Sequence, residues 1–398
     1  MLRRPPRSTL DRSSAASDVY KRQVITATGF EDAPIIFRKS GVGSNPIILS
    51  TGTGSFEDAG IAISGGDYFT FEGIDVKLLS GMDLEFGYLI QNASPTNGAS
   101  HNTIKNCDIS LTKKNVKSIG IIQSATNIGV GFEPSSLSGA NDGNKYQDIT
   151  VKACYNGILI TNQSSLFPDN DTEVSGCKIG ADYIGIPDGN LGGAGVSVYG
   201  MQIKNQKNCT ITNNAISNLT SFGTSVRGIH PLNGIGTITI SRNKVNGLKN
   251  TDDTNTSAAI GYDIMLNTEA GVNTANVFNN FASDITCAYA GSSTLDRAVK
   301  GIILRGGNSA SVFNIDFNSI SINAGGSPKV SSVILEVTSI IPTINIRNNI
   351  FANYTPNQSG NCGHYFYATP VSYTHLRAHE TVLDLVCRLL LEKKNTTQ

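Results

Sequence analysis

The stretch that decides the fold is Thr343-Ile344-Asn345-Ile346-Arg347-Asn348-Asn349-Ile350-Phe351, near the end of the chain. Ile344 and Ile346 alternate with polar residues, which is the pattern of a short β-strand with one buried face. The pair Asn348-Asn349 then interrupts the alternation, and an apolar residue follows at Phe351. Asparagine suits such a corner because it tolerates left-handed backbone angles and its amide can hydrogen-bond to neighbouring backbone groups. The stretch therefore predicts one strand and one corner of a repeating coil.

Two signatures interleave along the chain, nine of each. In the first, a small residue precedes a short apolar strand, and these residues are Gly60, Gly87, Gly120, Gly157, Gly195, Gly228, Gly261, Gly301 and Ser332. The second is the strand with its corner, and the corners end at Ile74, Cys107, Cys154, Cys177, Asn214, Asn243, Asn280, Asn318 and Asn349. The mean repeat, (349 − 74)/8, is a little over 34 residues. Units this short cannot bury an apolar face alone, so they must stack.

Stacking predicts an all-β solenoid of about nine coils, in which like strands run parallel about 4.8 Å apart. Helical repeats are excluded because no window has a sustained apolar stripe at helical spacing. Equivalent residues then lie above one another in columns. We expect the Asn column to form a ladder of amides, and Cys107, Cys154 and Cys177 to act as small buried hydrophobic groups. The six cysteines before residue 371 have no paired Cys-x-x-Cys spacing, so we expect no zinc site.

The repeats resemble the right-handed parallel β-helix class, the pectate-lyase-like superfamily. Their texture is similar to the β-helix regions of large exported proteins of Bacteroidota-type bacteria, in which a Gly-Ile-x-Leu strand, an Asn-Ser corner and an Arg-Asn-Asn-Ile-Phe-Ala-Asn segment follow in order. Here these are Gly301–Leu304, Asn318-Ser319 and Arg347–Asn353. The resemblance implies the fold and an extracellular or cell-surface location. It implies no single activity, since this fold carries lyases, hydrolases, adhesins and spacers.

The two ends of the chain lack this texture. Residues 1–23 carry six basic residues and no strand pattern, and residues 371–398 have leucines at helical spacing. Both peptides closely resemble the conceptual translation of sequencing-adapter DNA. That resemblance implies two non-native tails, the second of them helical if it folds, around a β-helix at 24–370 that is truncated at both ends. We therefore leave His375, His379 and Cys387 out of every site argument, and we conclude nothing about export from Met1.

Charge and hydropathy limit the partners. The chain has 31 basic and 31 acidic residues; the tails hold 10 and 5 of these, which leaves 21 and 26 in the repeats, a net charge of −5. This part of the chain offers no basic stripe for a nucleic acid. No apolar run approaches the roughly 20 residues that span a bilayer. We expect a monomeric module of a larger exported protein, with no nucleic-acid partner and no membrane span.

Outward residues of successive coils would build any site. If the residue after each Gly points inward, five polar residues share one face on neighbouring coils: Tyr199, His230, Asp263, Arg305 and Glu336. They would span about 15–20 Å at one strand spacing per coil, the length of a short sugar chain.

These residue types fit two kinds of function. A lyase of acidic polysaccharides needs a cation or metal to neutralise the uronate and a base to take the α-proton. Arg305 or His230 would act as the base, with Asp263 and Glu336 as supports, and calcium would enter only under this alternative. The leading hypothesis is a solvated polar face that binds a glycan or a partner with no catalysis, metal or cofactor. A third alternative is a spacer in a large surface protein.

Overall fold

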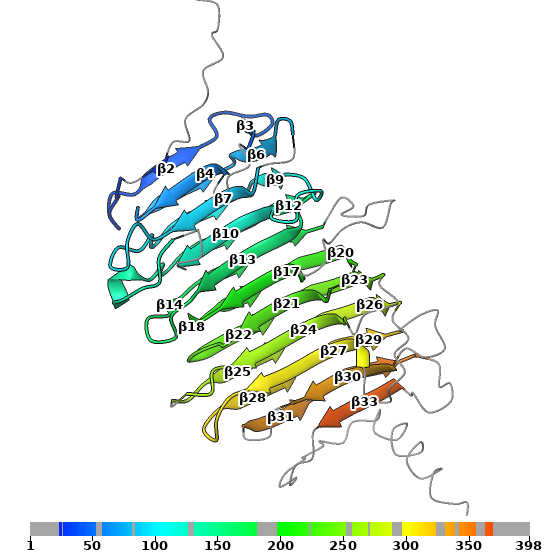
Figure 1. Cartoon of the computed structure of the whole chain (residues 1–398). Coiled ribbons are helices and arrows are strands. Elements are labelled where there is room, and N and C mark those ends of the chain that lie inside the picture. The colour runs from blue at the N-terminus through cyan, green and yellow to red at the C-terminus, as the bar shows by residue number, and fades with distance from the viewer. Residues whose placement is uncertain are drawn as a thin grey trace, which may run out of the picture.

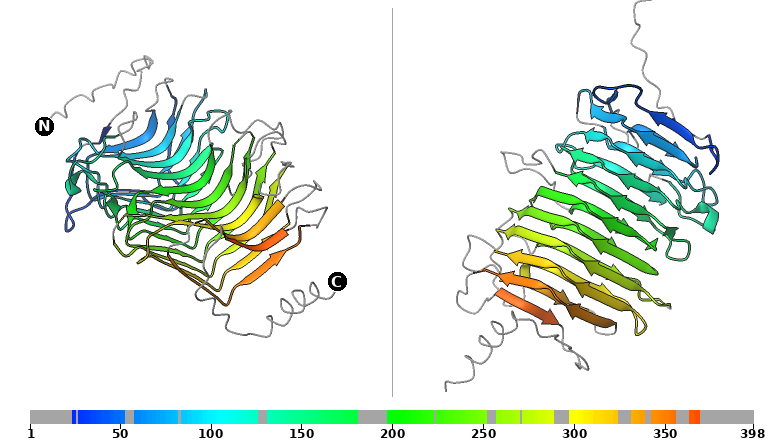
Figure 2. Two further views of the ribbon diagram at one scale, coloured as in Figure 1. Left: turned by 60° about the horizontal axis from the view of Figure 1, so that its bottom comes forward. Right: turned by 180° about the vertical axis from the view of Figure 1, so that it is seen from behind.

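The chain winds into a right-handed parallel β-helix, as Figures 1 and 2 show. The computed structural model describes residues 24–25, 27–52, 58–81, 84–125, 131–180, 197–222, 224–251, 257–269, 271–288, 297–323, 331–338, 342–355 and 363–368. In these residues every strand of three long sheets runs parallel to its neighbours. Connections between parallel strands of one sheet are right-handed in nearly all proteins. The predicted fold class is confirmed.

Each full coil gives one strand to each of three sheets. The first sheet contains β1 (Val24–Ile25), β4 (Ala59–Ser64), β7 (Phe86–Gln91), β10 (Ile119–Ala125), β13 (Asn156–Asn162), β17 (Val198–Lys204), β21 (Val226–Leu232), β24 (Ala259–Leu266), β27 (Arg297–Gly306), β30 (Ser331–Val337) and β33 (Gly363–Ala368). The second contains β2 (Ile35–Arg38), β5 (Phe69–Glu72), β8 (Thr103–Lys105), β11 (Lys145–Gln147), β15 (Glu173–Ser175), β19 (Thr210–Thr212), β22 (Thr237–Ser241), β25 (Thr274–Phe278), β28 (Val312–Asp316) and β31 (Thr343–Arg347).

The third sheet contains β3 (Ile47–Ser50), β6 (Asp75–Leu78), β9 (Asp108–Ser110), β12 (Thr150–Lys152), β16 (Lys178–Ile179), β20 (Ala215–Ser221), β23 (Lys244–Asn250), β26 (Phe281–Cys287), β29 (Ser319–Ile322) and β32 (Ile350–Asn353). Three short elements lie in the connections from the first sheet to the second. They are the paired strands β14 (Asp169–Asn170) and β18 (Gln206–Lys207) and a 3-10 turn, η1 (Leu137–Gly139). Ten full coils thus lie in the described part, one more than predicted, because β1–β3 carry neither sequence signature.

The repeated glycines fill one column of the first sheet, where that sheet lies closest to the third. A Cβ atom on Gly228 would lie 2.6 Å from Val245 Cγ1 and 2.6 Å from the carbonyl oxygen of Gly261. Real Cβ atoms do not approach this closely, so only glycine fits without a shift. Two assignments were wrong. Met201 pairs with Ile158, so Gly200 holds the place predicted for Gly195, which itself lies outside the described residues.

The last member of that column was also misplaced. Leu335 pairs with Ile302, and Ser332 pairs with Val299. Ile334, not Ser332, therefore stands level with Gly301. The run Val-Ile-Leu is apolar throughout, so the sequence pattern gave no signal for a shift of two residues.

The asparagine column forms a continuous ladder of hydrogen bonds. The Oδ1 atom of Asn280 accepts from the backbone N–H and the Nδ2 of Asn243, both at 3.0 Å, while its own Nδ2 donates to Asn318 Oδ1 at 3.0 Å. The same pattern runs from Asn214 to Asn349. The residue before each ladder Asn is left-handed, with φ of 56° at Asn279 and 54° at Asn348. The predicted ladder is confirmed.

The cysteine part of this column is corrected at one position. Val151 lies in the third sheet, opposite Ile109 and Ile179, so Cys154 belongs to the next corner of the same coil. Ile149 takes the predicted place of Cys154. Both corners contain a left-handed residue, Asp148 with φ of 53° and Ala153 with φ of 49°, so their sequence patterns are alike.

The remaining predictions concern the two ends of the chain and a membrane span. Residues 1–23 and 371–398 lie outside the described residues, so the tails and the domain bounds remain predictions. Among the helices of the described chain, none is long and apolar enough to cross a membrane.

Candidate functional site

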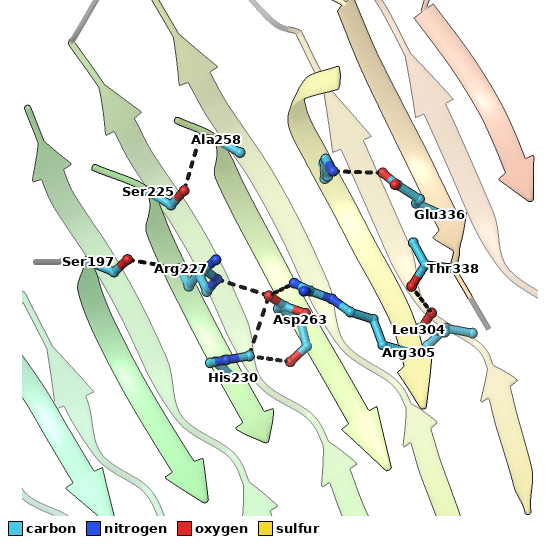
Figure 3. Close-up of polar contacts among 11 residues, drawn as sticks. Ser197, Ser225, Arg227, His230, Ala258, Asp263, Leu304, Arg305, Glu336 and Thr338 are labelled. Carbon is cyan, nitrogen blue, oxygen red and sulfur yellow. Dashed lines mark hydrogen bonds and ion pairs between the residues drawn. The ribbon is translucent and has the colours of Figure 1, made fainter. Parts of the chain in front are cut away.

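The five predicted site residues come from five successive strands of the first sheet, β17, β21, β24, β27 and β30. Figure 3 shows four of them, His230, Asp263, Arg305 and Glu336. The structure brings four of them together, with Tyr199, His230 and Arg305 grouped around Asp263. Glu336 lies further along the sheet and pairs with Lys300, whose Nζ is 2.9 Å from its Oε2. We call the group of Tyr199, Arg227, His230, Asp263 and Arg305 the Asp263 cluster.

The cluster begins where the outward columns change from apolar to polar. In the early coils these columns hold Ala62, Phe86, Leu89, Ile119 and Ile122, which form an apolar group separate from the main core. Through the register of the sheet, the positions of Phe86 and Ile119 become those of Tyr199 and Arg227 further along. This column becomes polar at Asn156 on β13, and the column of Leu89 and Ile122 becomes polar at Gln202 on β17.

Asp263 carries the negative charge at the centre of the cluster, and its side chain is 0% exposed. Its Oδ2 atom accepts from Arg227 Nε at 2.9 Å and also contacts Arg305 Nη2. A buried carboxylate is costly unless cations and hydrogen bonds compensate it. The two arginines supply that compensation, so Asp263 is a fixed anchor for them and not a free base. Within the part of the chain that the structure describes, its Oδ1 atom and the Nε atom of Arg305 are buried without a hydrogen-bond partner.

The orientation of His230 is fixed by one hydrogen bond across the sheet. The ladder between β21 and β24 ends at the pair Ile229 and Tyr262. Just beyond this pair, His230 Nδ1 lies 2.8 Å from the carbonyl oxygen of Asp263. A carbonyl oxygen only accepts, so Nδ1 carries the proton and Nε2 keeps its lone pair.

Burial lowers the pKa of His230, against the opposing effect of the Asp263 carboxylate. The nearby Arg227 and Arg305 guanidinium groups lower that pKa further. The imidazole is therefore neutral near pH 7. It offers an acceptor nitrogen between two arginines.

Tyr199 and Arg227 complete the cluster. The Tyr199 ring stacks on the His230 ring, with centroids 5.7 Å apart and planes 8° apart. The guanidinium carbon of Arg227 lies 5.6 Å from the Tyr199 ring centroid, within cation–π range. Sequence reasoning missed Arg227, because only residues after each glycine were assigned to the outward face. Its signal is its place directly before Gly228, one strand along from Tyr199.

This arrangement can recognise a ligand through its two arginine cations and its neutral hydrogen-bonding groups. Both acidic groups of the face, Asp263 and Glu336, are held in ion pairs. Arg305 keeps 35% of its side chain exposed above Asp263. Within the described residues, no group of three or more His, Cys, Asp or Glu side chains could hold a metal ion. The face therefore suits an anionic or hydroxyl-rich ligand.

Comparisons with known proteins found similarity only among solved structures. No protein-family model and no curated protein matches the sequence. A GH136 lacto-N-biosidase from Eubacterium ramulus is 10% identical with a TM-score of 0.41, over 87% of this chain and 59% of that one.

Two further solved structures resemble the chain. A periplasmic alginate epimerase is 15% identical with a TM-score of 0.32, over 82% of this chain and 77% of that one. A DFA-IIIase variant from Arthrobacter chlorophenolicus A6 is 12% identical with a TM-score of 0.32, over 78% and 62% of the two chains. The chain thus spans less than two thirds of the length of the biosidase, and at these values the likeness carries no argument about a ligand.

Proposed function

We propose that the outer face of the first sheet from β17 to β30 binds an acidic glycan, as part of an exported or cell-surface module without catalysis of its own. The observation that carries this proposal is the burial of Asp263 beneath Arg227 and Arg305. A face that hides its carboxylate and exposes guanidinium N–H groups attracts carboxylates or sulfates.

The geometry adds two supports for a sugar. The strands of the sheet are about 4.8 Å apart, which is roughly the length of one sugar residue. A polysaccharide that lies along the solenoid axis therefore passes about one coil per sugar residue. Asp263 Oδ1 is an acceptor and Arg305 Nε a donor, and both lack a partner beside the contact that joins the two side chains. Neither atom is exposed, so a ligand on this face would meet the remaining guanidinium N–H groups of Arg305, whose side chain is 35% exposed. Tyr199 adds an aromatic surface next to them.

The test is binding of polygalacturonate, alginate and chondroitin sulfate to the full chain, measured by titration calorimetry. Replacing Arg305 by Ala removes a charged hydrogen-bond donor, so we expect affinity to fall about tenfold, the equivalent of roughly 1.4 kcal/mol. Arg347→Ala is the matched control, because Arg347 also pairs with an aspartate, Asp316, but on the second sheet. Equal loss in both variants, or unchanged affinity in Arg305→Ala, would count against the proposal.

One observation favours a second function, a lyase acting on acidic polymers. His230 is neutral, and its Nε2 lone pair has no partner among the described residues, so it meets the requirement for a base beside the cation Arg305. Incubation with the same polymers and detection of the unsaturated uronate product separates the two functions. Product formation that is lost in His230→Gln would establish the lyase, whereas binding without product supports the glycan-binding module.

A further inference from the structure

The outer face of the first sheet has an accessible column beside the buried part of the Asp263 cluster. The side chains of His230 and Asp263 are 7% and 0% exposed, so that column is closed to a ligand. The outward column two residues further along each strand is half-buried and reaches solvent. It lies on four neighbouring strands, β17, β21, β24 and β27 (Figure 1), and consists of Lys204, Leu232, Met265 and Arg305. A ligand on this face therefore meets this column first.

The sheet keeps these four side chains in line. Lys204 is paired with Leu232, and Met265 is paired with Arg305. Between the two pairs, the N–H of Gly234 donates to the carbonyl oxygen of Met265 at 2.8 Å and joins the end of β21 to β24. Neighbouring strands are about 4.8 Å apart, so three steps put Lys204 and Arg305 about 14 Å apart along the solenoid. The column thus has a cation at each end and two apolar side chains between them.

Both cations can receive an acid group of a ligand. The Nζ atom of Lys204 lies 3.3 Å from Gln163 Oε1, which is neutral, and Lys204 forms no ion pair with a carboxylate that the structure describes. Arg305 pairs with Asp263, but that carboxylate is buried beneath it while the Arg305 side chain is 35% exposed. A guanidinium group has five N–H donors, so Arg305 keeps donors for a second acid group.

The spacing of the two cations selects among acidic polymers. Because one sugar residue is about as long as one strand spacing, residues i and i+3 of a chain along the axis lie over Lys204 and Arg305. A chain with a threefold screw turns every third residue to the same side, so both of these acid groups face the sheet and the two between them face away.

A twofold chain fits the column poorly. It turns every second residue to the sheet, so a chain anchored at Lys204 places its next acid group on Met265. A chain anchored at Arg305 places that group on Leu232 instead. Moving a carboxylate out of water onto an apolar side chain is costly when no partner compensates it.

We infer that the column from Lys204 to Arg305 binds a uronate polymer in a threefold conformation, and that four sugar residues are the shortest ligand that fills it. Lys204 is then a specificity-determining residue, which fixes the second acid group. Leu232 and Met265 contact the carbon-bound hydrogen atoms of the two middle residues. This inference rests on the proposed function, to which it adds the length and the helical form of the ligand.

Titration calorimetry of the full chain with oligogalacturonates of two to six residues tests the inference. A trimer reaches one cation and a tetramer reaches both, so we expect affinity to rise about tenfold between three and four residues. In Lys204→Ala this step should disappear, while the trimer should still bind because Arg305 remains. Lys204→Arg should keep the step. Lys244→Ala is the matched control and should also keep it, because Lys244 is an exposed lysine on β23 of the third sheet.

A further variant changes the spacing itself. Met265→Lys adds a cation two strands from Lys204 at a half-buried outward position, and circular dichroism checks that the variant folds. Residues i and i+2 of a twofold chain then each meet a cation. Oligoguluronates, which form twofold ribbons, should therefore gain affinity in this variant from three residues onward, whereas the unchanged chain should bind them without a step at four.

Two results would overturn the threefold spacing. Oligogalacturonate affinity could rise smoothly with length in the unchanged chain, or the step at four residues could survive in correctly folded Lys204→Ala. If Arg305→Ala still weakens binding in either case, the proposed function stands and only the spacing is wrong. A failure of every oligomer to bind would contradict the proposed function and the spacing together.

Discussion

Replacing Asn280 by Ala should remove a full set of the hydrogen bonds that each inner member of the asparagine ladder makes. Four hydrogen bonds of the Asn280 side chain disappear: two accepted from Asn243, one donated to Ile240 at 2.8 Å and one donated to Asn318. The Asn243 backbone N–H is buried and loses its acceptor, which costs about 1–3 kcal/mol, and the other three bonds contribute about 1 kcal/mol each. We expect the free energy of unfolding to fall by about 4–6 kcal/mol.

The assay is chemical denaturation followed by circular dichroism, together with hydrogen exchange at the Asn243 amide. Asn349→Ala is the matched control, because its side chain makes the same kind of contacts at the half-buried end of the ladder. There the Asn318 N–H can turn to water, so we expect a loss of about 1 kcal/mol. Asn280→Asp keeps the acceptor but faces Asn318 Oδ1 with a second acceptor, so its stability should recover as pH falls. Equal losses at Asn280 and Asn349 would refute the reasoning that burial of the Asn243 N–H sets the cost.

Three further changes test other parts of the structure. Gly228→Ala should cost about 1–3 kcal/mol by overpacking, and trimming Val245 to Ala should restore only part of it, because the carbonyl oxygen of Gly261 remains; complete rescue in denaturation would contradict this. Burial raises the pKa of Asp169 from 3.8 to about 6. The stability it contributes is therefore present below 3.8 and lost as pH rises through 6, so denaturation at several pH values should show a slope that Asp169→Asn removes, worth about 3 kcal/mol. Burial lowers the pKa of His230 below 6.5. Its contribution is present above 6.5 and lost at lower pH, so the stability difference from His230→Gln should shrink on acidification, and a constant difference would argue against a buried neutral imidazole.

The sequence predicted the features that repeat and missed those that occur once. An apolar strand that ends in a left-handed corner recurs from coil to coil, so the column from Asn214 to Asn349 could be found by pattern alone. Cys154 was misplaced for the same reason, since two corners of one coil have similar residues. The choice between them depends on which strand lies opposite, which is a non-local fact.

The candidate site also contains residues that the sequence predicted and residues that it missed. His230, Asp263 and Arg305 could be placed on one face because outward positions alternate with inward ones. Arg227 was missed because the alternation restarts at each glycine, where both Gly228 and Ile229 are buried. The pairing of Glu336 with Lys300, and not with the cluster, depends on side-chain reach that no sequence pattern contains.

The cluster lies where the repeat is interrupted. The ladder between β21 and β24 ends at Ile229 and Tyr262, and just beyond it the carbonyl group of Asp263 accepts from His230. That bond fixes the tautomer of the imidazole, and the stacked Tyr199 ring lies parallel to it. The end of one backbone ladder thus coincides with the coil whose imidazole has a fixed orientation and a defined acceptor, Nε2.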